Sequence, residues 1–121
     1  MPVPHYPRPP FKAQQQSFPG KTGLLEPRPD HGEQTYQGHG LLKGKRALIT
    51  GGDSGIGAAV AIAFAREGAD VAIAFLEGEE QDAAAIGALI EEAGQRALLV
   101  PCDVSDEGQA SALIAQVVKE M

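Results

Sequence analysis

The chain has 121 residues and a formal net charge of −6, which allows one compact domain and disfavours nucleic acid or an anionic membrane surface as a partner. Its single cysteine, Cys102, excludes an internal disulfide and is consistent with a reducing compartment. No apolar run approaches the ~20 residues of a membrane-spanning helix, and the proline-rich N-terminus does not resemble a signal peptide. We therefore expect a soluble, cytoplasmic protein.

Residues 1–40 form a proline-rich extension that contains eight of the nine prolines and shows neither helical nor strand periodicity. Proline restricts φ and removes a hydrogen-bond donor, so short polyproline II segments are expected. Too few apolar side chains are present to offset the entropy of ordering, which predicts disorder. The alternative is an arm that binds a partner subunit through Phe11, Phe18, Leu24 and Leu25.

Residues 41–121 alternate apolar strands with amphipathic helices. Strands are predicted at 46–50, 69–76 and 96–101, because these runs are continuously apolar, as in strands covered on both faces. Helices are predicted at 55–68, at 78–93 and after residue 105, with Ser105 as the N-cap of the third. The side chains expected to face the core are Ile56, Val60, Ala63 and Phe64 in the first helix, Ile86, Leu89, Ile90 and Ala93 in the second, and Leu113, Ile114, Val117 and Val118 in the third.

The order β-α-β-α-β-α predicts an α/β fold with a parallel sheet and helices on both faces. Right-handed crossovers place the strands in the order 3-2-1, which is the first half of a Rossmann-like doubly wound sheet. The last helix reaches Met121 without a stop signal, so we expect residues 41–121 to be a truncated N-terminal half-domain. The first strand would then be an open apolar edge, and the isolated chain is expected to be poorly soluble or oligomeric.

The turn after the first strand has glycines at 51, 55 and 57, a G-x-x-x-G-x-G spacing. Glycine lets the main chain approach a diphosphate without a Cβ in the way. The first turn of the following helix presents free N–H groups and the positive end of its dipole to the same anion. A tight turn without a ligand is the alternative, but its place inside a βαβ unit favours dinucleotide binding.

The stretch GKRALITGGDSGIG resembles the Thr-Gly-x-x-x-Gly-x-Gly signature of the short-chain dehydrogenase/reductase family. GADVAIAF and LLVPCDVSD resemble that family's second strand and the Asp-Val after its third. The resemblance implies that Thr50 braces the turn and that the diphosphate and ribose of NAD or NADP are lined by Gly51, Asp53, Ser54, Gly55, Ile56 and Gly57. It also implies that Asp103 accepts a hydrogen bond from the adenine amino group, with Val104 beside the ring.

The same resemblance implies hydride transfer between a nicotinamide cofactor and a carbonyl or alcohol carbon, by a homo-oligomer that is commonly a tetramer. The family's Asn-Asn-Ala-Gly segment and its catalytic Ser and Tyr-x-x-x-Lys do not occur in the 121 residues, and no tyrosine follows Tyr36. We therefore assign no catalytic residue and no metal ligand, and we expect the chain by itself to bind a dinucleotide weakly and to be inactive.

Phe75 stands at the end of the second strand, where NAD-preferring members often have an aspartate. No basic residue for a 2′-phosphate follows it directly, and Glu77, Glu79 and Glu80 would repel that group, which favours NAD over NADP. A solvated acidic start of the second helix is the alternative interpretation of these glutamates. The F-x-x-Q-x-Q-x-x-P-G pattern of residues 11–20 resembles a bacterial subgroup with a proline-rich extension.

Two other functions compete with this interpretation. The first is a non-catalytic dinucleotide-sensing or interaction module that uses the same turn. The second is a methyl-transferring enzyme, which fits less well because its glycines are usually closer together and an acidic residue usually stands where Phe75 is. Cys102 is expected to be a small buried residue rather than a nucleophile, because no histidine follows His39 to activate it.

Overall fold

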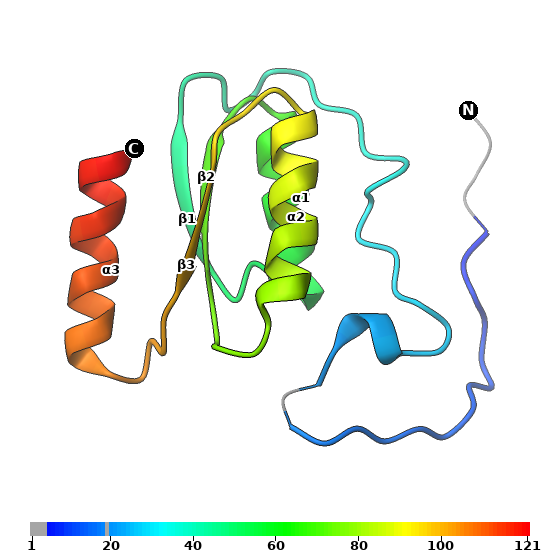
Figure 1. Cartoon of the computed structure of the whole chain (residues 1–121). Coiled ribbons are helices and arrows are strands. Elements are labelled where there is room, and N and C mark those ends of the chain that lie inside the picture. The colour runs from blue at the N-terminus through cyan, green and yellow to red at the C-terminus, as the bar shows by residue number, and fades with distance from the viewer. Residues whose placement is uncertain (1–4, 19) are drawn as a thin grey trace.

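The computed structural model describes residues 5–18 and 20–121, and within them it contains three parallel strands and three α-helices. The strands are β1 (Arg46–Thr50), β2 (Asp70–Phe75) and β3 (Ala97–Pro101), and the helices are α1 (Gly55–Arg66), α2 (Glu80–Glu92) and α3 (Glu107–Glu120). The strands pair in the order β1-β2-β3, so the predicted 3-2-1 order is confirmed. Helices α1 and α2 cover one face of the sheet and α3 covers the other (Figure 1).

The central strand β2 explains the apolar character of the strand sequences. Its side chains alternate between two cores: Val71, Ile73 and Phe75 pack with α1 and α2, and Ala74 packs on the side of α3. From Val71 to Phe75 every residue is at most 5% exposed. A strand that is covered on both faces has no solvent side, so no polar alternation is present in its sequence.

The face of α1 that packs on the sheet differs from the predicted face. Ile56 is 86% exposed, and the buried residues of α1 are Ala58, Ala61, Ile62 and Ala65. The rotation of the helix is set by its first turn, where Gly57 packs against the backbone of Gly51. This close contact directs the next residue, Ala58, into the core and leaves Ile56 outside. The predicted role of Ile56 in the core is therefore wrong.

The beginning of α3 also differs from the prediction. Its N-cap is Asp106, whose Oδ1 accepts a hydrogen bond from the Gln109 N–H at 3.0 Å, and not Ser105. The Ser105 hydroxyl donates instead to Asp103. Of the predicted apolar stripe, Leu113 is buried and Val117 is half-buried, whereas Ile114 and Val118 are 54% and 74% exposed. Only one edge of the predicted stripe therefore contacts the sheet.

Two glutamines close the first part of the extension into a loop. Gln14 donates through Nε2 to the Glu26 carbonyl at 2.6 Å and accepts from the Glu26 N–H at 3.0 Å. Gln16 forms the same pair with the backbone of Lys21, at 3.1 and 2.7 Å. A short 3-10 helix, η1 (Thr22–Leu24), lies between these two pairs of hydrogen bonds. Each glutamine amide thus pairs with both backbone groups of one residue, as a neighbouring strand would, and holds two chain segments together.

The second part of the extension runs beside the layer of α1 and α2 and enters β1 (Figure 1). Its attachment point is Arg66 at the end of α1, which donates to the carbonyls of Gly32, Glu33 and Tyr36. Disorder of the extension in solution stays a prediction. Pro2, Pro4 and Pro19, which belong to the predicted polyproline II segments, lie outside the described residues.

Candidate functional site

The turn between β1 and α1 is held tightly at its two ends. Gly51 has φ +67, and its N–H continues the sheet by donating to the Ala74 carbonyl at 2.8 Å. A Cβ on Gly57 would lie 2.2 Å from the Gly51 carbonyl oxygen, which is backbone and cannot move aside cheaply. Gly57 is therefore required by the close approach of α1 to the turn, whereas Gly51 is required by its left-handed conformation.

Gly52 is a site residue that the sequence interpretation missed. A Cβ at this position would lie 2.5 Å from Cγ2 of Ile73, because the turn passes directly over β2. The signal was present in the Gly-Gly pair that follows Thr50. The residue that matters for packing against the sheet is the second glycine of that pair.

The first turn of α1 is suited to an anion. Ser54 is the N-cap, yet within the described residues its side chain makes no capping hydrogen bond, and no acidic side chain lies in the first turn. The first N–H groups of a helix have no partner inside the helix, so those of α1 remain available to a ligand. Gly55 has open space on the side where a Cβ would stand. The diphosphate of a dinucleotide fits this arrangement.

A cleft of about 430 Å³ lies where the carboxyl ends of the three strands meet. It brings together seven of the ten predicted residues: Thr50, Gly51, Asp53, Ser54, Phe75, Asp103 and Val104. Gly55 lines a neighbouring cavity, Ile56 points into solvent, and Gly57 supports the turn from behind. The cleft is also lined by Cys102, which is buried as expected.

Asp103 is held in an ionised form by its neighbour. Its Oδ1 accepts hydrogen bonds from the Ser105 hydroxyl at 2.6 Å and from the Ser105 N–H at 3.0 Å. These bonds lower the pKa of Asp103 below its usual value, because they stabilise the carboxylate. An ionised, oriented carboxylate is a suitable acceptor for an amino group. Ser105, which was predicted to be a cap, is therefore a positioning residue for Asp103.

Asp53 has the opposite electrostatic character. Its side chain is 4% exposed, and its Oδ2 is buried without a hydrogen-bond partner among the described residues. Burial, followed by the neighbouring acidic groups of Glu79 and Asp82, raises the pKa of Asp53 to about 7. The cleft thus has a carboxyl group at one side that is protonated much more readily than an ordinary aspartate.

The described residues provide neither a metal site nor a membrane segment. No group of three or more His, Cys, Asp or Glu side chains in this part of the chain could hold a metal ion. None of the helices within residues 5–18 and 20–121 has the length and apolar character to cross a bilayer.

The sequence pattern of the short chain dehydrogenase family matches residues 45–121. An uncharacterized oxidoreductase, YghA, of Escherichia coli (strain K12) is 51% identical over 111 residues, which are 92% of this chain and 38% of the relative. An NADPH-dependent aldehyde reductase of Arabidopsis thaliana is 38% identical over 88% of this chain and 39% of its own length. The chain therefore spans little more than a third of these relatives, and the match to the E. coli protein includes most of the extension.

Solved structures of short chain dehydrogenases are also similar to this chain. A short chain dehydrogenase from Burkholderia cenocepacia J2315, crystallised in complex with NADP, superposes with a TM-score of 0.63 and is 42% identical. The superposition covers 65% of this chain and 32% of that protein. The glycine turn, the parallel sheet and the Asp-Val after β3 all lie inside the matched family region. The chain belongs to the short-chain dehydrogenase/reductase family.

Proposed function

We propose that this chain forms the cofactor-binding part of a cytoplasmic NAD(P)-dependent oxidoreductase, which transfers a hydride between the nicotinamide and a carbonyl or alcohol carbon. The observation that carries the proposal is the cleft at the carboxyl ends of β1, β2 and β3, with the glycine turn on one side and Asp103 on the other. This is where open parallel sheets bind dinucleotides. The cofactor, when bound, supplies the hydride chemistry, and the chain positions it.

Eight of the ten predicted residues share the task of positioning the cofactor. Gly51, Ser54 and Gly55 hold the diphosphate at the start of α1, and Gly57 keeps the turn close to the helix. Asp103 accepts from the adenine amino group beside Val104. Thr50 and Phe75 close the floor of the cleft at the ends of their strands.

Tyr36 is not placed to donate a proton in this reaction. Its hydroxyl donates to Glu67 at 2.5 Å, at the C-terminal end of α1, whereas the cleft lies at the N-terminal end. The 12 residues of α1 separate the two ends by about 18 Å. We therefore expect the 121-residue chain to bind dinucleotides without catalysing turnover.

Calorimetric titration of the whole chain with NADH tests the proposal. We expect saturable binding that Gly57→Ala abolishes, because the new Cβ would displace the turn. Gly23→Ala is the matched control, since nothing lies within 4 Å of the added Cβ there. Absence of NADH and NADPH binding by the unmodified chain would contradict the proposal, as would reduction of a carbonyl compound by the chain alone.

We further propose that NAD is preferred over NADP. Glu79 lines the cleft beyond the end of β2, and Glu77 lines the cavity next to it, so both carboxylates lie near the end of the ribose-binding strand. Their charge opposes a 2′-phosphate. We expect NADH to bind more tightly than NADPH, and Glu77→Gln to narrow the difference, with Glu92→Gln on the far end of α2 as the control. Tighter binding of NADPH by the unmodified chain would overturn this preference.

We also propose that the protein is a homo-oligomer, by analogy with its family. The exposed Ile114 and Val118 on α3 support an apolar contact there. Sedimentation velocity tests it: we expect Val118→Lys to shift the chain toward the monomer, and a monomeric unmodified chain would contradict the proposal.

A further inference from the structure

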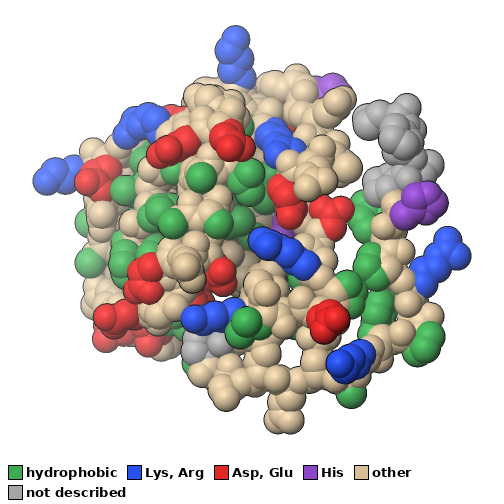
Figure 2. All heavy atoms as spheres, turned by 45° about the vertical axis from the view of Figure 1, so that its right-hand side comes forward, with side chains coloured by type: hydrophobic (Ala, Val, Ile, Leu, Met, Phe, Trp, Pro, Cys, Tyr) green, Lys and Arg blue, Asp and Glu red, His purple; other side chains and the backbone are tan. Residues whose placement is uncertain are grey.

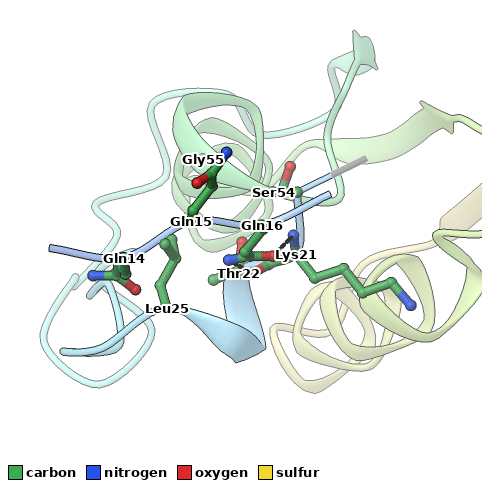
Figure 3. Close-up of a pocket in the computed structure, with 9 residues that line it drawn as sticks. Gln14, Gln15, Gln16, Lys21, Thr22, Leu25, Ser54 and Gly55 are labelled. Atoms are coloured by element: carbon green, nitrogen blue, oxygen red, sulfur yellow. Dashed lines mark hydrogen bonds between the residues drawn. The ribbon is translucent and has the colours of Figure 1, made fainter. Parts of the chain in front are cut away.

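Part of the extension lies opposite the candidate cofactor site. A cavity of about 390 Å³ separates the two, lined on one side by Ser54 and Gly55 at the start of α1. Its other side consists of extension residues: Gln14, Gln15, Gln16, Gly20, Lys21, Thr22 and Leu25 (Figure 3). The loop that Gln14 and Gln16 close therefore stands opposite the helix N-terminus that receives the diphosphate. Openings between the extension and the body are visible in the space-filling view (Figure 2).

Phe18 lies on the wall of a second cavity, of about 410 Å³, at the adenine end of the same site. Across from it are Leu76, Cys102 and Asp103, which follow β2 and β3. Phe18 is 88% exposed, so most of its apolar surface has no partner among the described residues. An aromatic face beside Asp103 is a natural stacking partner for a purine.

Lys21 supplies the positive charge that the body of the site does not have. Among the described residues that line the three cavities at this edge of the sheet, the one basic residue is Lys21, in the first cavity. Glu77 lines the second cavity and Glu79 the third. Lys21 lies near Glu80 at the start of α2. The pKa of Glu80 is lowered mainly by the hydrogen bond from the Gly78 N–H, and the positive charge of Lys21 lowers it further. In Figure 3 the Lys21 side chain extends away from Ser54 and Gly55 toward α2, so its positive charge lies on the α2 side of the groove.

We propose that the N-terminal extension is the outer wall of the dinucleotide groove, in which Phe18 covers the adenine and Lys21 supplies a positive charge that attracts the phosphates. This inference rests on the proposed function, since it assumes that the groove holds an adenine dinucleotide. The family pattern begins at residue 45, after the extension, so the wall is an addition to the common cofactor site.

The hydrogen bonds of the extension explain how such a wall is kept in place. The Gln16 amide binds both backbone groups of Lys21, and the Gln14 amide does the same for Glu26. Arg66 fixes the following segment to the body. A loop that is ordered before the ligand arrives loses less conformational entropy on binding. The two glutamines of the F-x-x-Q-x-Q pattern therefore stabilise the loop that forms the wall.

Tryptophan fluorescence tests the position of Phe18 directly, because the chain contains no tryptophan. In Phe18→Trp the single indole should be quenched when ADP is added, with a saturable dependence on ADP concentration. Phe11→Trp is the matched control: Phe11 is an exposed aromatic residue of the same extension, and it lines none of the three cavities. Its emission should not change. Equal responses of the two variants, or none in Phe18→Trp while ADP binds, would overturn the inference.

Calorimetry with adenosine and with ADP separates the two contacts. Phe18→Ala should raise the Kd of both ligands at least about fivefold, since stacking acts on the base. Lys21→Gln should raise the Kd of ADP by up to about fivefold, the size of an exposed ion pair, and leave adenosine unaffected. Lys12→Gln serves as the control on the same extension. An equal effect of Lys21→Gln on both ligands would exclude its attraction of the phosphates.

The outcomes also distinguish this inference from the proposed function. If Gly57→Ala abolishes ADP binding while Phe18→Ala and Lys21→Gln bind like the unmodified chain, the cofactor site stands and the wall is refuted. If the unmodified chain does not bind ADP at any concentration, both fail.

Discussion

The two ends of α1 each hold a buried carboxyl group, and the two groups behave in opposite ways. Glu67, after the last turn, is 4% exposed and accepts hydrogen bonds from the Tyr36 hydroxyl at 2.5 Å and from the N–H groups of His39 at 2.6 Å and Leu41 at 3.2 Å. The Tyr36 hydrogen bond, followed by those from the backbone, lowers the pKa of Glu67. Asp53, before the first turn, is equally buried, but its Oδ2 has no partner in the described part of the chain and its pKa is raised to about 7.

Equal burial therefore has opposite consequences, because Glu67 accepts three hydrogen bonds whereas Asp53 lies beside the acidic Glu79 and Asp82. A carboxylate with a full set of donors stabilises the segment that supplies them, here the end of the extension. A carboxyl group without them costs free energy when it ionises. Such a group is found at the edge of the cleft, where a binding site requires polar groups that the protein itself does not saturate. The end that holds Glu67 anchors the extension, and the end that holds Asp53 faces the cleft.

The largest effect is expected at the cleft end, from Gly57→Ala. The new Cβ would overlap the Gly51 carbonyl, so either the turn or the start of α1 must move. We expect a loss of about 3 kcal/mol in the free energy of unfolding, at the upper part of the range for overpacking. Urea denaturation measures it, with Gly23→Ala as the control. An unchanged midpoint would show that the turn is not held as the structure describes.

Glu67→Ala should have the next largest effect, because it leaves the Tyr36 hydroxyl and two backbone N–H groups without their acceptor. We expect a lower Tm and faster proteolysis within residues 30–41, while the strands stay protected. The exposed Glu91→Ala is the control. The contribution of Glu67 is present above its unfolded pKa of about 4.5, and it is lost as the pH falls through the lower folded value. A pH-independent difference from the unmodified chain would contradict this role.

Asp53 should affect stability with a pH dependence opposite to that of Glu67, and Asp53→Asn should remove it. Between the unfolded pKa of 3.8 and the folded value of about 7, the native protein keeps a proton that the unfolded chain releases. The free energy of unfolding of the unmodified chain therefore falls as the pH rises through this window. Asparagine does not ionise, so the variant should gain stability relative to the unmodified chain from pH 4 to pH 7 and keep that gain above. Thermal unfolding across this range measures it, and parallel Tm curves would refute the raised pKa.

The smallest effect is expected from Tyr36→Phe, which removes one donor of Glu67 and keeps the ring. We expect a small decrease of Tm at pH 7 that disappears at low pH, where Glu67 is protonated. The decrease should be smaller than for Glu67→Ala, because the bonds from His39 and Leu41 remain. Tyr6→Phe, elsewhere on the extension, is the control. An effect equal to that of Glu67→Ala would mean that the hydroxyl alone holds the extension.

Much of the site could be predicted from local patterns. The spacing of Gly51, Gly55 and Gly57 located the turn, and the resemblance of the Asp-Val at 103–104 to the family motif located the opposite wall of the cleft. The rotation of α1 could not be predicted in the same way. Alanines occur on all sides of α1, so its sequence allows several of its faces to pack on the sheet. The contact of Gly57 with Gly51 selects one of these faces. For the same reason Ile56 was placed in the core, although it is exposed.

The sequence by itself determined the order of strands and helices, the parallel sheet and the position of the glycine turn, because continuous apolar runs, helical periodicity and glycine spacing are local properties. The tertiary structure alone decided which groups meet across long separations: Gln14 with Glu26, Phe18 with the cavity of Asp103, and Glu67 with Tyr36. It also decided that Asp53 and Glu67 titrate in opposite directions. A pKa depends on burial and on nearby donors, and neither is a property of the residue or of its neighbours in the chain.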